Sequence, residues 1–345
     1  MQKRDVIIAA LQCQSPPYVP WSWGTTHAAG ERLKAYLQRD ELHTFFDNHI
    51  WMCGPQHPAG ERLDARLVRD CYGVVYTHAE EQDLGVVVQV PLQEPEDLAH
   101  YQFPDPRDPS WYADLGKWRH DLSDHFTMYL LGGALYECAW ALRGMEDLLM
   151  DMVERPEFVE ALLDAITENR LIQVEQAIAM DFDGVFFGDD YGMQTGLMMG
   201  AAHWRHFIKP RLARLIAPLR AAGKYAYLHS CGKVDGILDD LVEIGLHIFN
   251  PFQPEVMDVF ALLPRYHGRL AFHGGMGVQS VLPHGTTAEV TEMTRRLLRA
   301  GESGGFIFSP SHDATPDIPP ENLVAMMRVL TDQAGYRSLK SSSRL

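Results

Sequence analysis

The second half of the chain alternates short apolar runs with longer amphipathic segments, and this pattern limits the possible folds more than any other feature. The runs that predict strands are residues 184–187, 224–228, 247–249, 270–272 and 306–308. Helices are expected between and after them, at 157–180, 202–222, 234–244, 287–300 and 320–335. Strands that alternate with helices in this way form βα units and a parallel sheet.

Two earlier apolar runs, 126–131 and 18–23, raise the number of expected strands to seven, and an eighth is expected from 74–76 or 86–90. This number predicts an α/β fold of the (β/α)₈ TIM-barrel type, which residues 24–120 elaborate as helices and a hairpin. No Gly-x-Gly-x-x-Gly motif opens a helix, which removes the commonest dinucleotide-binding fold. We expect one domain over 1–337 and a frayed tail at 338–345.

The composition argues against several classes of partner. The net charge of −16 disfavours binding to nucleic acid or to an anionic membrane surface. The five cysteines are odd in number and scattered, which is typical of a reducing compartment. There is no signal-peptide pattern and no run of about 18 apolar residues. We therefore expect a cytoplasmic protein, and its assembly state, with a homodimer among the options, is left open.

Polar or metal-binding residues follow five of the predicted strands, interleaved with Gly and Pro. In chain order they are Asp189, Asp190, Tyr191 and Gln194; His229 and Cys231; Asn250 and Gln253; His273; and His312. In barrel enzymes the loops after the strands converge on one face. A single shared site therefore explains the polar residues at five strand ends better than chance does.

His229 and Cys231 are the residues most suited to a metal. They stand two apart at a strand end, so their side chains share a side of the sheet. Zn²⁺ prefers nitrogen and sulfur ligands in tetrahedral geometry. A His-x-Cys pair also occurs by chance, and a small buried cysteine often only packs. Its place among the polar strand ends favours the metal.

The acidic and aromatic residues allow two readings each. One of Asp189 and Asp190 is expected to cap a helix or solvate a loop, and the other to act in catalysis, since neighbouring carboxylates raise one pKa. Glu137, at the start of a helix, either faces the pocket or forms a salt bridge. The residues that we expect to contact substrate are Trp21, Trp23, Glu137, Tyr191, Gln194, Asn250, Gln253 and His273.

Several stretches resemble the uroporphyrinogen decarboxylase superfamily, which includes methyltransferases that move methyl groups to and from corrinoid proteins. They are 17–20, 183–190, 207–210, 229–232, 244–245, 250–254, 274–275 and 320–322. The resemblance implies a (β/α)₈ barrel. Decarboxylases of this superfamily share an arginine-rich N-terminal segment that binds the carboxylates of the porphyrinogen. The corresponding stretch here, 21–27, contains no arginine, so the methyltransferase branch is the better match.

In that branch, zinc is held by a His-x-Cys pair and a later cysteine at the last strand. This chain has the pair at His229 and Cys231, but reads Ser-Pro-Ser-His over 309–312 and has no cysteine there. His312 is the first candidate for the third ligand. Glu137, Asp189 and Asp190 are the alternatives.

The resemblance implies a zinc-dependent methyltransferase that acts on a small methylated substrate, an aryl methyl ether among the options. Catalysis would involve His229 together with Asp189 or Asp190. No Asp-x-His-x-x-Gly motif for cobalamin is present, so the corrinoid would arrive on a partner protein. Two alternatives stay open: a metal-free decarboxylase or lyase that uses the same residues for acid–base work, and a non-catalytic corrinoid- or tetrapyrrole-binding module.

Overall fold

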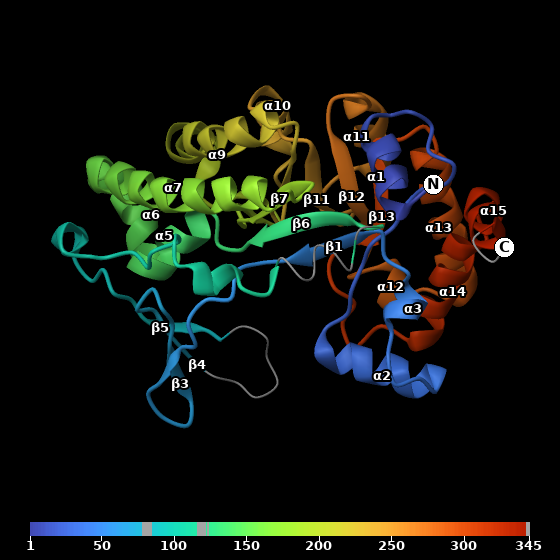
Figure 1. The fold of residues 1–345 in the computed structure, drawn as a ribbon, viewed down its shortest axis with the longest axis horizontal. Helices are drawn as coiled ribbons and strands as arrows, with labels where there is room; N and C mark the ends of the chain where they lie inside the picture. The colour runs from blue at the N-terminus through green and yellow to red at the C-terminus, as the bar shows by residue number, and fades with distance from the viewer. Residues whose placement is uncertain (78–84, 116–121, 123, 343–345) are drawn as a thin grey trace.

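A curled sheet of seven parallel strands forms the centre of the molecule (Figure 1). The computed structural model describes residues 1–77, 85–115, 122 and 124–342. The strands lie in the order β1 (Ile50–Cys53), β6 (Phe126–Leu131), β7 (Gly184–Gly188), β10 (Tyr225–His229), β11 (Ile248–Phe252), β12 (Ala271–Met276) and β13 (Phe306–Pro310). Every neighbouring pair is parallel, so all the carboxyl ends lie on one side of the sheet.

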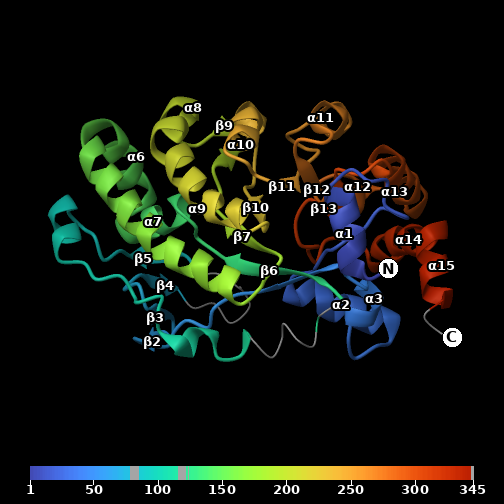
Figure 2. The ribbon, with the colours of Figure 1, turned by 45° about the horizontal axis from the view of Figure 1, so that its top comes forward.

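Helices surround the outer face of this sheet, as Figures 1 and 2 show from two directions. They are α5 (Tyr136–Arg143), α6 (Met145–Glu154), α7 (Pro156–Ala179), α8 (Gly200–His203), the π-helical turn η3 (Trp204–Ile208), α9 (Lys209–Ala221), η4 (Asp235–Ile237), α10 (Leu238–Glu243), α11 (Val259–Tyr266), α12 (Val281–His284), α13 (Thr287–Gly301) and α14 (Pro320–Thr331). The N-terminal half adds α2 (His27–Leu37), α3 (His43–Phe46), η1 (Pro95–Ala99) and η2 (Pro109–Tyr112). The five predicted helices of the second half are confirmed.

Six of the seven predicted strands are confirmed, but the closed eight-stranded barrel is not. The predicted strand at 18–23 makes only an isolated parallel bridge between Trp21 and Phe308, at the β13 edge of the sheet. The Trp21 carbonyl also accepts a hydrogen bond from the His49 amide, just before β1 at the other edge. A short extended segment therefore lies between the two edges without forming a full strand.

The two runs offered for the eighth strand lie elsewhere. Strands β4 (Val75–Thr77) and β5 (Val87–Gln89) join β2 (Glu61–Arg62) and β3 (Leu67–Arg69) in an antiparallel sheet that projects from the body in Figure 1. Strand β5 is largely exposed, whereas a barrel strand is covered on both faces. The barrel strand that the prediction missed is β1, within the region expected to be only an elaboration.

Helix α1 (Lys3–Leu11) closes the amino-terminal end of the strands. Its Ile7 is fully buried against apolar side chains from the inner face of the sheet, namely Ile50, Phe126, Met128, Tyr227, Ile248 and Ile307. Arg4 forms an ion pair, at 2.7 Å, with the buried carboxylate of Asp183, which lies just before β7. With this end filled, the open end is the one where the strands finish.

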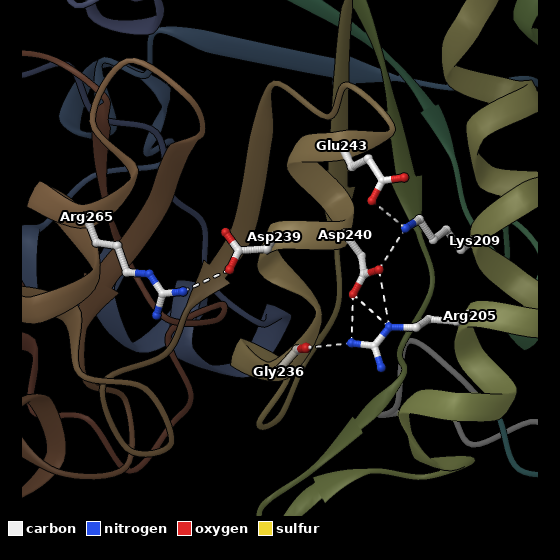
Figure 3. Close-up of polar contacts among 7 residues, drawn as sticks. All are labelled: Arg205, Lys209, Gly236, Asp239, Asp240, Glu243 and Arg265. Carbon is white, nitrogen blue, oxygen red and sulfur yellow. Dashed lines mark hydrogen bonds and ion pairs between the residues drawn. The ribbon is translucent and has the colours of Figure 1, made fainter.

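Ion pairs join consecutive helices on the outer surface (Figure 3). Asp240 and Glu243 on α10 both accept hydrogen bonds from Lys209 at the start of α9, and Asp240 also pairs with Arg205. Asp239, on the other side of α10, pairs with Arg265 of α11 at 2.8 Å. Exposed pairs of this kind contribute about 0–1 kcal/mol each, so they align the helices more than they stabilise them.

Helix α15 (Ala334–Ser342) continues into the tail expected at 338–345, of which residues 343–345 lie outside the described part. None of the helices that the structure describes combines the length and apolar character that crossing a membrane requires.

Candidate metal and substrate site

The fold brings His229, Cys231 and His312 together. One ligand atom from each lies within 4.8 Å of the others. His229 is the last residue of β10, and Cys231 follows it with its Sγ 3.4 Å from His229 Nε2. His312 comes from the loop after β13, three strands away along the sheet, and the curl of the sheet closes that distance. Two imidazoles and a thiol are a donor set that suits Zn²⁺.

Asn250 sets the orientation of the His229 ring. Its side-chain NH₂ donates to the His273 carbonyl at 2.9 Å, so its oxygen is the atom that faces His229 Nδ1, at 2.5 Å. An amide oxygen only accepts, and Nδ1 must therefore carry the proton. The lone pair of Nε2 is left free on the side of Cys231. This is the tautomer that a metal ligand needs.

We expect Asn250→Ala to weaken zinc binding by about 10- to 100-fold, because the ring loses the partner that fixes its tautomer. Competition with a chromophoric chelator measures the affinity. Asn48→Ala is the matched control, since Asn48 bonds only to the backbone of Trp23 in the same region. An equal loss of affinity in both variants would contradict this role for Asn250.

The other two donors differ in their surroundings. Burial raises the pKa of the Cys231 thiol to about 12, and the nearby Asp190 carboxylate adds to the effect. A bound dication would reverse that balance and favour the thiolate. His312 is exposed, and its Nδ1 accepts a hydrogen bond from the Asp313 amide at 2.9 Å. Ligation through Nε2 requires the proton on Nδ1, so this contact must open when a metal binds.

The adjacent carboxylates have different positions. Asp189 is fully buried and accepts hydrogen bonds from three successive backbone amides at the start of α5, those of Leu135, Tyr136 and Glu137, at 2.7–3.1 Å. It therefore caps this helix and points away from the metal donors. Asp190 accepts from the Cys231 amide at 2.7 Å and lies 3.7 Å from His229 Nε2. Of the two, only Asp190 lies beside the donors. Asp189 takes the capping role that was expected of one of the pair, and catalysis by Asp190 stays a prediction.

Asp189→Ala should destabilise the protein by about 2–4 kcal/mol, because three buried amides lose a charged acceptor. Urea unfolding measures the change. Asp190→Ala removes a single backbone contact at a half-exposed position and should cost less. Equal destabilisation by the two substitutions would show that the cap is not the main role of Asp189.

Glu137 is a partly buried acid beside this pair. Burial, together with the charges of Asp189 and Asp190, raises its pKa to about 8. Its carboxyl group therefore holds a proton at neutral pH. No ion pair is recorded for it among the described residues, so the salt-bridge reading from the sequence is not supported.

Two cavities meet at the cluster of His229, Cys231 and His312. The first, of about 410 Å³, is lined by His229 and the second, of about 540 Å³, by Cys231. His312 and Asp313 line both. The three donors thus stand at the boundary, where a bound ion would be accessible from either side.

The predicted substrate residues divide between these cavities. Trp23, Asn250 and His273 line the first, and Gln194 and Gln253 line the second. Gln253 also accepts a hydrogen bond from the Gly232 amide, which holds the loop after Cys231. Glu137 lines neither of the two.

Trp21 and Tyr191 are corrections, because both are fully buried in the core. The Trp21 ring packs against His49 and Tyr336, and Tyr191 packs between Tyr136 and Trp204. Large aromatic side chains bury more apolar surface in the core than in an open pocket. For this reason both rings lie in the core although each stands near a strand end.

Some lining residues were missed by the sequence reasoning. Ile50, Trp51 and Met52 come from β1, and Asp313 follows His312 directly. The signal for β1 was present as the apolar run 50–53 followed by Gly54 and Pro55, a short strand ending in a turn. It is only four residues long and was passed over inside an irregular region.

Comparison with known proteins places the chain. The family model described as uroporphyrinogen decarboxylase (URO-D) matches residues 71–333. The chain belongs to the uroporphyrinogen decarboxylase family. A solved structure described as a methyltransferase from Methanosarcina mazei is similar to it with a TM-score of 0.73 and 16% identity, over 96% of this chain and 99% of the other. At that identity the likeness shows a shared fold and no more.

Other solved structures are more distant. A β-L-arabinopyranosidase from Geobacillus stearothermophilus matches with a TM-score of 0.40 and 12% identity, over 93% of this chain and 78% of the other. A Xaa-Pro dipeptidase matches with a TM-score of 0.33 and 10% identity, over 68% and 61%. Similarity at these levels carries no argument. No protein with a curated description matches the chain.

Proposed function

We propose that this member of the family is a zinc-dependent methyltransferase that moves a methyl group between a small methylated substrate and a corrinoid protein. The observation that carries the proposal is the group of two imidazoles and one thiol, within 4.8 Å of one another, where two cavities meet. A family member that only decarboxylated its substrate by acid–base chemistry would not need a thiol in this group.

A bound Zn²⁺ would act as a Lewis acid at the heteroatom that carries the methyl group, or would present a thiol acceptor as its thiolate. His229, Cys231 and His312 would hold it, and Asn250 orients His229. Glu137 retains a proton at neutral pH but lines neither cavity, so it would supply a leaving oxygen only through Asp190, which lies 3.7 Å from His229 Nε2 beside the donors.

The corrinoid is expected on a partner protein, since the sequence contains no Asp-x-His-x-x-Gly motif. The partner would approach the carboxyl ends of the strands, because the amino-terminal end is filled by α1. Either cavity would then give access to the cluster.

The charge of the cavities disfavours the alternative of a decarboxylase for a substrate with many carboxylates. Within the described part of the chain, no lysine or arginine lines either cavity. Such a substrate would enter without basic side chains to pair with its carboxylates, which is costly wherever binding removes their water.

The test is a methyl-transfer assay with zinc-loaded protein, free cob(I)alamin as the corrinoid and a panel of methoxylated aromatics, methylated amines and methylated thiols. We expect methylcobalamin to form with at least one donor. Its absorption spectrum measures its formation. No transfer to cob(I)alamin from any donor, together with release of CO₂ from a carboxylated substrate by metal-free protein, would favour the lyase.

A further inference from the structure

The walls of the first cavity are rich in polar residues, yet those residues are bonded to one another. The Asn48 side chain accepts a hydrogen bond from the Trp23 amide and donates one to the Trp23 carbonyl. The Asn250 side chain bonds in the same way to the His229 ring and to the His273 carbonyl. The Ser22 hydroxyl donates to the Ile50 carbonyl at 3.3 Å. These contacts hold the wall together, and none of these groups carries a positive charge.

Both ring nitrogens of His273 also have hydrogen-bond partners within the protein. Its Nε2 lies 2.7 Å from the Ser22 carbonyl, which can only accept, so Nε2 carries the proton. Its Nδ1 then accepts from the Tyr227 hydroxyl at 2.6 Å. Burial lowers the pKa of His273 to about 4, in keeping with a neutral ring. This histidine therefore offers no positive charge to an anion.

What remains for a ligand is an apolar surface beside the metal donors. The rings of Phe186 and Tyr227 lie with their centroids 4.7 Å apart, and Phe186 continues to His229 at 5.8 Å. Met52 and Trp23 complete this surface. Flat aromatic walls favour stacking with a ring of the ligand.

The carboxylates nearby offset the charge of a metal. Asp313 lines the cavity, and its carboxylate packs closely against Gly24. Its Oδ1 would lie only 2.8 Å from a Cβ added at that glycine. A dication with the Cys231 thiolate, Asp190 and Asp313 around it would leave no net positive charge to attract an anion.

We propose that the first cavity selects a methyl ether on a single uncharged aromatic ring and rejects the same ring when it carries a carboxylate. The inference rests on the proposed function, and it deepens it by naming the charge of the substrate. Desolvation of a carboxylate without a partner is the physical cause of the rejection.

Isothermal calorimetry with zinc-loaded protein and no corrinoid tests the proposal. The probes are 4-methoxybenzamide and the nearly isosteric 4-methoxybenzoate. We expect the benzamide to bind at least about tenfold more tightly than the benzoate. Asp313→Asn should raise the affinity for the benzoate severalfold and change that for the benzamide little. Asp317→Asn, in the second cavity, should change neither affinity.

Benzoate binding as tight as that of the benzamide, or no binding of either probe, would overturn the inference. Because the readout is binding, its failure is distinguishable from that of the proposed function. A preserved preference with no methyl transfer would refute the transferase but leave the charge selection standing.

Discussion

Cys231→Ala should lose the zinc of the purified protein and lower methyl transfer by about a thousandfold or more. The thiolate is the one sulfur ligand in the proposed site and the only negative charge in the donor set, so its removal leaves two neutral imidazoles. His229→Ala should have the same effect, since it removes the donor that Asn250 orients. Metal content is measured by mass spectrometry on protein purified without chelators.

Cys13→Ala is the matched control. Cys13 is also a free, partly exposed cysteine, but it lies after α1, at the opposite end of the strands from the site. It should keep full zinc content and full transfer. If Cys231→Ala retained stoichiometric zinc, or if both variants lost it equally, the proposed ligand set would be wrong.

Glu137→Gln should keep the zinc but lower methyl transfer by about a hundredfold, because the neutral amide has no proton to give. It should also change how stability depends on pH. The folded pKa of about 8 lies above the ordinary value of 4.5, so the folded state holds a proton that the unfolded state releases. The stability from this group is full below about pH 4.5 and falls as pH rises to about 8.

In metal-free protein, unfolding by urea across this range should show a loss on the order of 4 kcal/mol that Glu137→Gln abolishes. Glu157→Gln is the control, since Glu157 also lies in the first turn of a helix but is exposed. A variant at Glu137 with unchanged transfer and an unchanged pH profile would remove this residue from the mechanism.

The strands of the second half could be predicted because parallel strands covered on both faces read as continuous apolar runs between helical segments. The same rule failed before residue 126. The run 86–90 is apolar enough for a barrel strand, yet it forms the exposed strand β5 of the projecting sheet. Strand β1 was too short to stand out, and sequence alone does not show which runs share a sheet.

The site was predictable where position along a strand determines direction. His229 and Cys231 follow from that rule, and His312 from its place after the last strand. Which of Asp189 and Asp190 turns inward depends on where α5 begins in space, and no local pattern gives that. Trp21 and Tyr191 are buried by long-range packing for the same reason.

X-ray absorption at the zinc edge, measured on zinc-loaded protein, tests the central claim most directly. The proposed site predicts one sulfur at about 2.3 Å from the metal and two imidazole nitrogens at about 2.0–2.1 Å. The sulfur signal should vanish in Cys231→Ala and one imidazole in His312→Ala. A first shell of oxygen and nitrogen alone, or a sulfur signal that survives in Cys231→Ala, would contradict the account.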